Sequence, residues 1–162
     1  MRTRFPQARW LPSLLALASL MCLASCASRP GTVSGELPLV NLESLELQDQ
    51  QLLVDLSIRN LNDQRLESPL REASLTIDGQ AADFESTLPL TLNISARGRE
   101  NLRLTATADS ATQAALLALA DERGQSLPYQ LTLTFDGRRA SRTPVEQNGF
   151  LHPVPGQPGR FR

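Results

Sequence analysis

Residues 127–137, LPYQLTLTFDG, decide the fold class of this 162-residue chain. The odd positions from Leu127 to Phe135 are all apolar or aromatic, whereas most positions between them are Gln or Thr. Successive side chains of a β-strand point to opposite faces, so this period of two predicts a strand with one buried face and one solvated face. The pair Asp136-Gly137 that follows favours a tight hairpin turn of two residues.

Three further segments alternate in the same way, within residues 52–58, 88–94 and 102–108. Pro89 has no N–H to donate, which indicates an edge position or a late start for the second of these strands. Another hairpin is expected at Asp78-Gly79, directly after the segment from Ala73 to Ile77. Short strands separated by turn signals are typical of an antiparallel sandwich, so we expect a mainly β fold with about seven strands.

One short helix is expected among these strands. Ser110-Ala111-Thr112-Gln113 has the form of a capping box, in which Ser110 caps the helix. Strong helix formers occupy 114–120, and Gly124 is suited to end the helix after about three turns. The leucines within it indicate a helix that buries its apolar side as a lid across one end of the sandwich, and we favour this over a helix that binds a partner.

The first 25 residues have the pattern of a secretion signal. Arg2, Arg4 and Arg9 precede an apolar run at 11–23. A basic lead-in before a short apolar segment is typical of a signal peptide that is removed from the mature protein. The run is too short for a membrane-spanning helix, which needs about 20 apolar residues, so we expect residues 1–25 to be a signal peptide and not a permanent anchor.

The apolar run ends in Leu23-Ala24-Ser25-Cys26, which resembles the lipobox of bacterial lipoproteins. That resemblance implies that the signal peptidase recognises Leu23, Ala24 and Ser25, and that Cys26 becomes the acylated first residue of the mature chain. Cys22 fits less well, because Met21 stands where this peptidase accepts a small residue. Acyl chains such as palmitate on Cys26 would hold the protein to a membrane, since each buried methylene contributes about 0.8 kcal/mol.

The residue after the predicted lipid anchor indicates which membrane the protein is sorted to. An Asp at this place would signal retention in the inner membrane of enteric bacteria, and the chain has Ala27 instead. We therefore expect the outer membrane of a bacterial cell envelope, with the domain facing the periplasm.

The rest of the chain divides into three parts. Residues 26–38 are small and polar with several Pro and Gly, which is typical of a flexible tether. Residues 39–152 carry the strand and helix signals and form the expected domain. The Pro- and Gly-rich stretch 153–162 predicts a disordered tail, because its prolines lack the donors that a strand or helix needs.

Charge and cysteine content limit the possible partners. Three of the 16 basic residues lie in the signal, so 13 remain beside 17 acidic residues and the mature chain has a net charge of −4. This balance argues against a nucleic-acid-binding surface, and we expect no nucleic acid among the partners. With Cys22 removed and Cys26 acylated, no thiol remains for a disulfide.

The order of the elements resembles the type 2 late-embryogenesis-abundant family, which is also described by its water-stress and hypersensitive-response domain. The likeness covers residues 39–152. Family members have an Asn-Pro-Asn turn after their second strand, and Asn60-Leu61-Asn62 stands at the matching place with Leu61 instead of Pro. The side chains of Asn60 and Asn62 can still end the strand by hydrogen bonding to the backbone.

Further segments follow in the family's order. Leu75-Thr76-Ile77-Asp78-Gly79 resembles its strand with a short hairpin, Leu127-Pro128-Tyr129 opens the strand after the helix, and Asn148-Gly149-Phe150-Leu151 resembles its closing strand. The resemblance implies an immunoglobulin-like or fibronectin-like sandwich without a catalytic constellation, in proteins associated with tolerance of drying and other stress. A shared fold alone does not establish that function.

No set of residues in the sequence points to catalysis. The single histidine, His152, stands beside Pro153 and has no mature cysteine to join it, which disfavours a metal site or a Cys-His nucleophile. Asp83 and Glu85 lie two residues apart and could act as paired acids, but the mature chain has few aromatic residues to line a sugar-binding cleft. We therefore expect no catalytic residue, metal or cofactor.

Two groups of arginines leave a binding role open. Arg138, Arg139 and Arg142 follow the second Asp-Gly pair, and Arg97 and Arg99 lie between two strands. They can contact anionic lipid headgroups or the carboxylates of a partner, or they can keep a sheet edge from pairing.

The leading expectation is a non-enzymatic, membrane-anchored domain that protects neighbouring proteins or envelope surfaces from drying and stress through weak polar contacts. The alternative is an envelope adaptor or lipid-binding module, which holds one specific partner or an acyl chain between its sheets.

Overall fold

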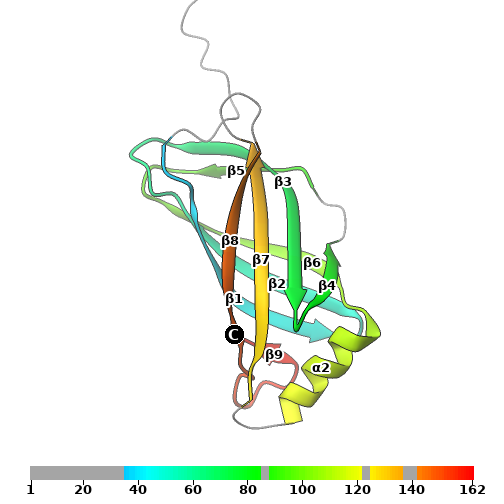
Figure 1. Ribbon diagram of the computed structural model, residues 1–162. Coiled ribbons are helices and arrows are strands. Elements are labelled where there is room, and N and C mark those ends of the chain that lie inside the picture. Colours follow the sequence, from blue (N-terminus) through cyan, green and yellow to red (C-terminus); the bar gives the residue numbers. More distant parts are fainter. Residues whose placement is uncertain (1–34, 85–87, 122–124, 137–141) are drawn as a thin grey trace, which may run out of the picture.

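The computed structural model describes residues 35–84, 88–121, 125–136 and 142–162, which form a mainly β fold (Figure 1). The elements of these residues are β1 Leu39–Gln48, β2 Gln51–Arg59, β3 Leu66–Ile77, β4 Gln80–Phe84, β5 Leu90–Ile94, β6 Arg99–Thr107, α2 Ser110–Asp121, β7 Leu127–Asp136, β8 Arg142–Leu151 and β9 Arg160–Phe161. The expected mainly β fold with one short helix is confirmed. It has more strands than the seven or so expected, because β4 and β9 are too short to stand out as alternating runs.

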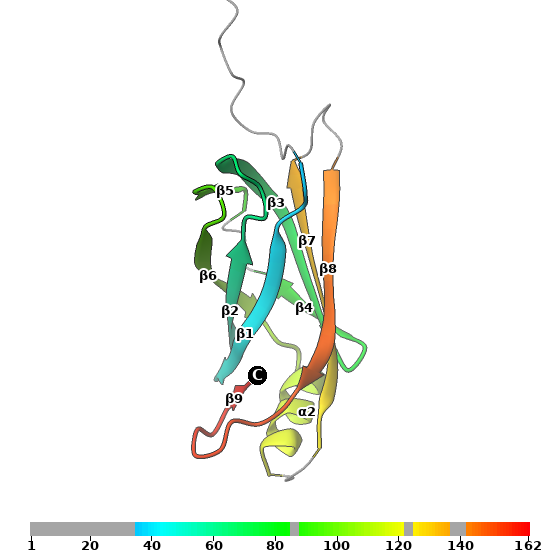
Figure 2. The same cartoon turned by 90° about the vertical axis from the view of Figure 1, so that its left-hand side faces the viewer.

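The strands form two layers that pack face to face (Figure 2). All strand pairs are antiparallel, in the order β8-β7-β3-β4-β6-β2-β1-β9, with β5 beside β3. Strand β4 belongs to both layers, because Ala82 pairs with Leu75 of β3 while Asp83 pairs with Thr107 of β6. One side of the sandwich is therefore closed by a shared strand.

The opposite side is closed by a side chain. The backbone N–H of Leu42 in β1 donates a hydrogen bond to Oε1 of Gln147 in β8 at 2.7 Å. At Leu42, strand β1 is the edge of its layer, so its backbone N–H has no neighbouring strand to bond to. An edge N–H that is shielded from water is destabilising unless it finds another acceptor. Gln147 therefore joins the two layers where no strand is shared.

The core forms between the layers from the faces that the alternation predicts. Each of the predicted alternating segments buries its apolar side, and their side chains belong to one cluster. The apolar residues that are 0–1% exposed in β2 and β7 are Leu52, Val54, Leu56, Ile58, Leu131, Leu133 and Phe135. Burial of this kind contributes about 25 cal/mol per Å² of apolar surface, so the filled space between the layers is the main source of stability.

Two β-bulges change which positions face the core. In β1 the register shifts between Leu42 and Ser44, which leaves Glu43 as an extra residue. The buried positions accordingly change from even, as at Val40, to odd, as at Leu45. Strand β3 carries a second shift of this kind. One extra residue turns every following side chain to the other face, so the bulges decide which polar residues reach the surface together.

Helix α2 lies across one end of the sandwich, as expected of a lid, with Leu116 and Leu119 buried (Figure 1). The predicted cap is wrong by one residue. The Asp109 carboxylate accepts a hydrogen bond from the Thr112 N–H at 2.7 Å, so Asp109 and not Ser110 caps the helix. This bond is the main reason why the pKa of Asp109 lies below its usual value. Asp and Ser cap helices about equally well, and two adjacent candidates left the choice open.

The prediction of a disordered tail at 153–162 is wrong. The N–H groups of His152 and Arg162 each donate to the other residue's carbonyl, at 2.9 and 3.0 Å, and the Leu47 N–H donates to the Gly159 carbonyl at 2.8 Å. Strand β9 pairs with β1, and Phe161 is only 1% exposed. The prolines shape a loop that turns the chain back, and burial of the Phe161 ring stabilises its return.

Several predictions fall on residues outside the described ones. These are the signal peptide, the lipobox with Cys26, most of the tether, Glu85, Gly124 and the Gly137 turn. The strands on either side of that turn do pair, with Asp136 opposite Arg142. The other predicted hairpin is confirmed, because Asp78 and Gly79 join β3 to β4 with φ of 49° and 80°, as a type I′ turn requires. Within the described part of the chain, nothing helical has the length and apolar character that crossing a membrane needs.

Candidate functional sites

The Asn60-Leu61-Asn62 turn ends β2 and holds three segments of the chain together. Asn60 is fully buried, and its Nδ2 donates to the carbonyls of Gln64 at 2.7 Å and Ser95 at 3.0 Å. Its Oδ1 accepts from the backbone N–H of Asn62 at 3.0 Å. The predicted bonding of the strand end to backbone is seen for the Asn60 side chain, whereas the Asn62 side chain bonds to the backbone of Glu36. Asn60 acts as an internal support of the loops at one end of the sandwich, where a buried amide must find such partners.

Asn62 fixes the place where the chain enters the domain. Its Oδ1 accepts from the Glu36 N–H and its Nδ2 donates to the Glu36 carbonyl, both at 2.8 Å. The domain therefore includes Glu36, before the expected boundary at 39, and Pro38 is buried. Any segment that precedes Glu36 leaves the sandwich from this end. We call it the entry end.

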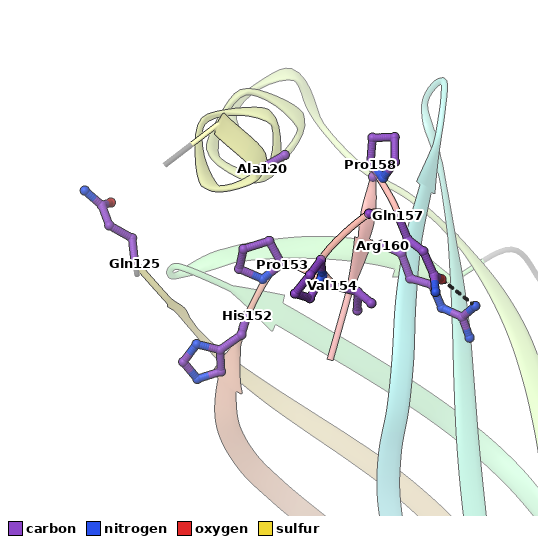
Figure 3. A pocket seen from close by; sticks show the side chains of 11 residues that line it. Ala120, Gln125, His152, Pro153, Val154, Gln157, Pro158 and Arg160 are labelled. Atoms are coloured by element: carbon purple, nitrogen blue, oxygen red, sulfur yellow. Dashed lines mark hydrogen bonds between the residues drawn. The ribbon is translucent and has the colours of Figure 1, made fainter. Parts of the chain in front are cut away.

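The opposite end of the molecule carries α2 and the C-terminal loop (Figure 1). A pocket of about 670 Å³ lies there between the end of the helix, at Ala120, and the loop from His152 to Arg160. Figure 3 shows the imidazole of His152 and the guanidinium of Arg160 on opposite sides of the pocket, with Arg160 bonded to Gln157. The lining offers prolines and a valine but no nucleophile beside a base, so the pocket has the character of a contact surface.

The outer face of β1, β2 and β6 bears a dense set of polar residues. The strand registers place Asn41, Ser57 and Asn101 in one row across the three strands, and Ser44, Asp55 and Arg103 in the next. We call these two rows the polar face. Asn101 and Arg103 are exposed and Asn41 and Asp55 are half-buried, whereas Ser44 and Ser57 are buried, so the groups of this face that reach solvent are amides and charges.

Asp55 is the centre of a charged network on the polar face. Its carboxylate accepts from Nε and Nη2 of Arg103 at 2.6 and 2.9 Å and from the Ser44 hydroxyl at 3.0 Å. The bond from Arg103 is the largest cause that holds the pKa of Asp55 below its usual value, and partial burial acts against it. From β9, Nη2 of Arg160 donates to the Ser44 hydroxyl at 3.3 Å. The returning C-terminus thus completes the polar face.

An open hollow of about 710 Å³ lies over this network. Arg99, Asn101 and Arg160 contribute to its walls together with Asp55 and Arg103. The charged groups at its floor already satisfy one another, since the fork of Arg103 holds both carboxylate oxygens of Asp55. The hollow can take up water or polar surface groups of a neighbouring molecule without a fixed ligand.

Residues considered for catalysis are not brought together. Asp83 and His152 are exposed, on β4 and after β8 respectively, and Glu85, the suggested partner of Asp83, lies outside the described residues. Among the described His, Cys, Asp and Glu residues, no three are grouped as a metal ion would require. Of the arginines, Arg97 forms an ion pair with Asp63 at 2.7 Å, while Arg138, Arg139 and the side chain of Arg142 lie outside the described part.

Comparison with known proteins gives structural likeness without a family. No protein-family model and no curated protein matches the chain. A crystal structure of a protein from Archaeoglobus fulgidus matches with a TM-score of 0.45 and 9% identity, over 74% of this chain and 98% of that one. The solution structure of AT1g01470 from Arabidopsis thaliana matches with a TM-score of 0.40 and 14% identity, over 75% and 89%.

The polar face is the main feature that the sequence pattern did not reveal. Alternation placed Asp55 and Ser57 on one side of their strand and Arg103 on one side of another. It did not show that β2 lies between β1 and β6, or which residues stand opposite one another. That depends on the bulge at Glu43, for which the sequence gives no clear signal.

Proposed function

We propose that this protein is a lipid-anchored, non-enzymatic lipoprotein of the bacterial envelope, with a stress-protective domain like those of the type 2 late-embryogenesis-abundant family. The polar face carries the proposal. It offers amide and paired charged groups on a rigid layer, which suits weak contacts with many surfaces better than tight binding of one ligand. When water is lost, such groups can replace some of the hydrogen bonds that neighbouring surfaces made with it.

The packed core supports the same view. Side chains of both layers that are almost fully buried fill the space between the sheets. A sandwich that holds an acyl chain needs an apolar cavity there. The filled core therefore favours a function through surface contacts over a lipid-binding module that holds an acyl chain between its sheets.

Protection during drying is the direct test. A labile enzyme is dried and rehydrated with the purified protein or with an equal mass of an unrelated sandwich, and its remaining activity is measured. We expect more activity with this protein, and part of the gain to be lost when Asn41 and Asn101 are replaced by Ala. The matched control replaces Asn93 and Asn148, which lie off the polar face. No gain over the unrelated sandwich would contradict the proposed function.

The lipid anchor has a separate test. Cys26→Ser should release the protein from the membrane fraction and abolish labelling with radioactive palmitate, because it removes the thiol that is acylated. Cys22→Ser is the matched control and should leave both unchanged. Labelling that persists in Cys26→Ser, or that is lost only in Cys22→Ser, would show that the anchor is wrongly assigned.

An envelope adaptor is the second candidate, and the pocket beside α2 favours it. Leu117 on the same helix is 57% exposed, and the pocket lies at the end farthest from the entry of the chain. A partner bound there would be held away from the membrane. A protein that co-purifies in fixed ratio and is lost from Leu117→Asp would support this function over the protective one.

A further inference from the structure

The end row of the β1-β2-β6 layer, next to the polar face, combines exposed apolar and basic side chains. The registers place Leu39, Arg59 and Arg99 side by side on its outer side at the entry end. Leu39 is 46% exposed and Leu37, just before it, is 39% exposed. Large apolar side chains exposed together at one place need a reason, and here Leu39 stands opposite Arg59, which in turn stands opposite Arg99.

The two arginines of this row stand directly opposite each other without a neutralising partner. Arg59 pairs with Arg99 in the ladder, and neither forms an ion pair with another described residue. Like charges at directly opposite positions destabilise a sheet. An anion that binds both guanidinium groups would remove this cost, and arginine binds phosphate oxygens through two parallel hydrogen bonds.

Among the described residues, no acid forms an ion pair with Arg59 or Arg99, although Glu43 and Glu100 line the same surface hollows as Arg99. Asp63 is held by Arg97, and Glu36 also lies close enough to Arg97 to raise the pKa of that arginine. Along the outer face, Arg103 and Ser44 already hold the Asp55 carboxylate. The positive charge of Arg59 and Arg99 therefore remains available at the edge of the domain.

We propose that Leu37, Leu39, Arg59 and Arg99 form a membrane-facing surface, which binds the phosphate groups of anionic phospholipids while the leucines enter the headgroup region. The inference rests on the proposed lipid anchor. Cys26 lies ten residues before Glu36, a span of at most about 35 Å, and the chain enters the domain at this same end. Arginines beside leucines suit the headgroup region of a membrane. The long aliphatic part of an arginine side chain can lie in apolar surroundings while its guanidinium group reaches phosphate.

The surface gives the domain a defined orientation. The entry end faces the lipid, and α2 with its pocket points away from it (Figure 1). The polar face begins one row above the lipid and is open to neighbouring molecules of the envelope.

The test measures the orientation of the acylated full chain in vesicles of phosphatidylethanolamine and phosphatidylglycerol. A single cysteine at Ala96→Cys, in the turn beside Asn60, carries an environment-sensitive fluorophore, and Ala118→Cys on α2 is the matched position at the far end. Both alanines are exposed. We expect iodide to quench the label at 96 severalfold less than the label at 118, and the difference to shrink in vesicles without phosphatidylglycerol or at high salt.

Substitutions then assign the effect to the surface. Replacing Leu37 and Leu39 by Ser and Arg59 and Arg99 by Gln should make the label at 96 as accessible as the label at 118. The control, Leu117→Ser with Arg162→Gln, changes the same residue types at the far end and should have no effect. The comparison of 96 with 118 in the unaltered protein does not depend on whether the multiple variant folds.

Two failures can be told apart. If the chain does not fractionate with vesicles, the proposed anchor is wrong and the inference falls with it. If the chain fractionates with vesicles but the label at 96 is as accessible as that at 118, the anchor stands and the membrane-facing surface alone is overturned.

Discussion

At the scale of single residues, the Arg59–Arg99 pair makes a testable contribution to stability. Arg59→Glu would place opposite charges face to face, and such a cross-strand pair contributes about 0.2–1 kcal/mol. We expect the free energy of unfolding in urea to rise by about this amount and the gain to shrink with salt. The matched change Arg103→Glu should have the opposite sign, since it puts a second carboxylate beside Asp55. Equal losses in both variants would contradict the assigned pairing.

A second residue-scale prediction concerns the pH dependence of stability. The pKa of Asp55 is lowered in the folded protein, chiefly by Arg103. A lowered pKa means that the group contributes stability fully above its unfolded value, near 3.8, and loses this contribution as the pH falls through the folded value. Asp55→Asn should therefore reduce stability at pH 7 and flatten its fall below about pH 4, seen in urea unfolding at several pH values. The control is Asp83→Asn at an exposed carboxylate of β4, which should change the free energy of unfolding at pH 7 by less than about 0.5 kcal/mol.

Residue-level structure was predictable where partners are close in sequence. The Asn60-Leu61-Asn62 turn could be placed because Asn side chains bond to backbone one or two residues away. Its bonds to Ser95 and Glu36 could not, since they join segments that only the folded topology brings together. The Ser44-Asp55-Arg103 row could not be predicted for the same reason, because its residues lie on three strands and Arg103 is far from the other two in the sequence.

At the scale of elements, the two-residue strand β9 holds the C-terminal end of the chain against β1. Phe161 is buried, whereas Phe150 on β8 is 61% exposed. Phe161→Ala removes a core ring and should lower the free energy of unfolding by about 3–5 kcal/mol, measured by urea denaturation. Phe150→Ala should change it by less than about 0.5 kcal/mol. A small effect at Phe161 would mean that the last residues are not docked as the structure has them.

The long strands could be predicted because an alternating run reports burial directly, as in β2 and β7. Strand β9 could not, because two residues show no period and the surrounding prolines suggest disorder. The helix was found, but its first residue was not, because Asp109 and Ser110 satisfy the same capping rule.

At the scale of the whole molecule, the sandwich is closed by different means on its two sides. Strand β4 pairs with both layers on one side, whereas on the other the Leu42 N–H bonds to the side chain of Gln147. Gln147→Ala would leave that N–H without its partner, at a cost of about 1–3 kcal/mol where it stays shielded from water. We expect hydrogen exchange at the Leu42 amide to become faster while the amides of core strand β2 stay protected, because the contact between β1 and β8 can open locally. Glu146→Ala, on the exposed side of the same strand, is the control. Exchange that rises equally throughout both layers would show that the β1–β8 contact and the core open together. The Gln147 side chain would then not stabilise this side of the sandwich separately.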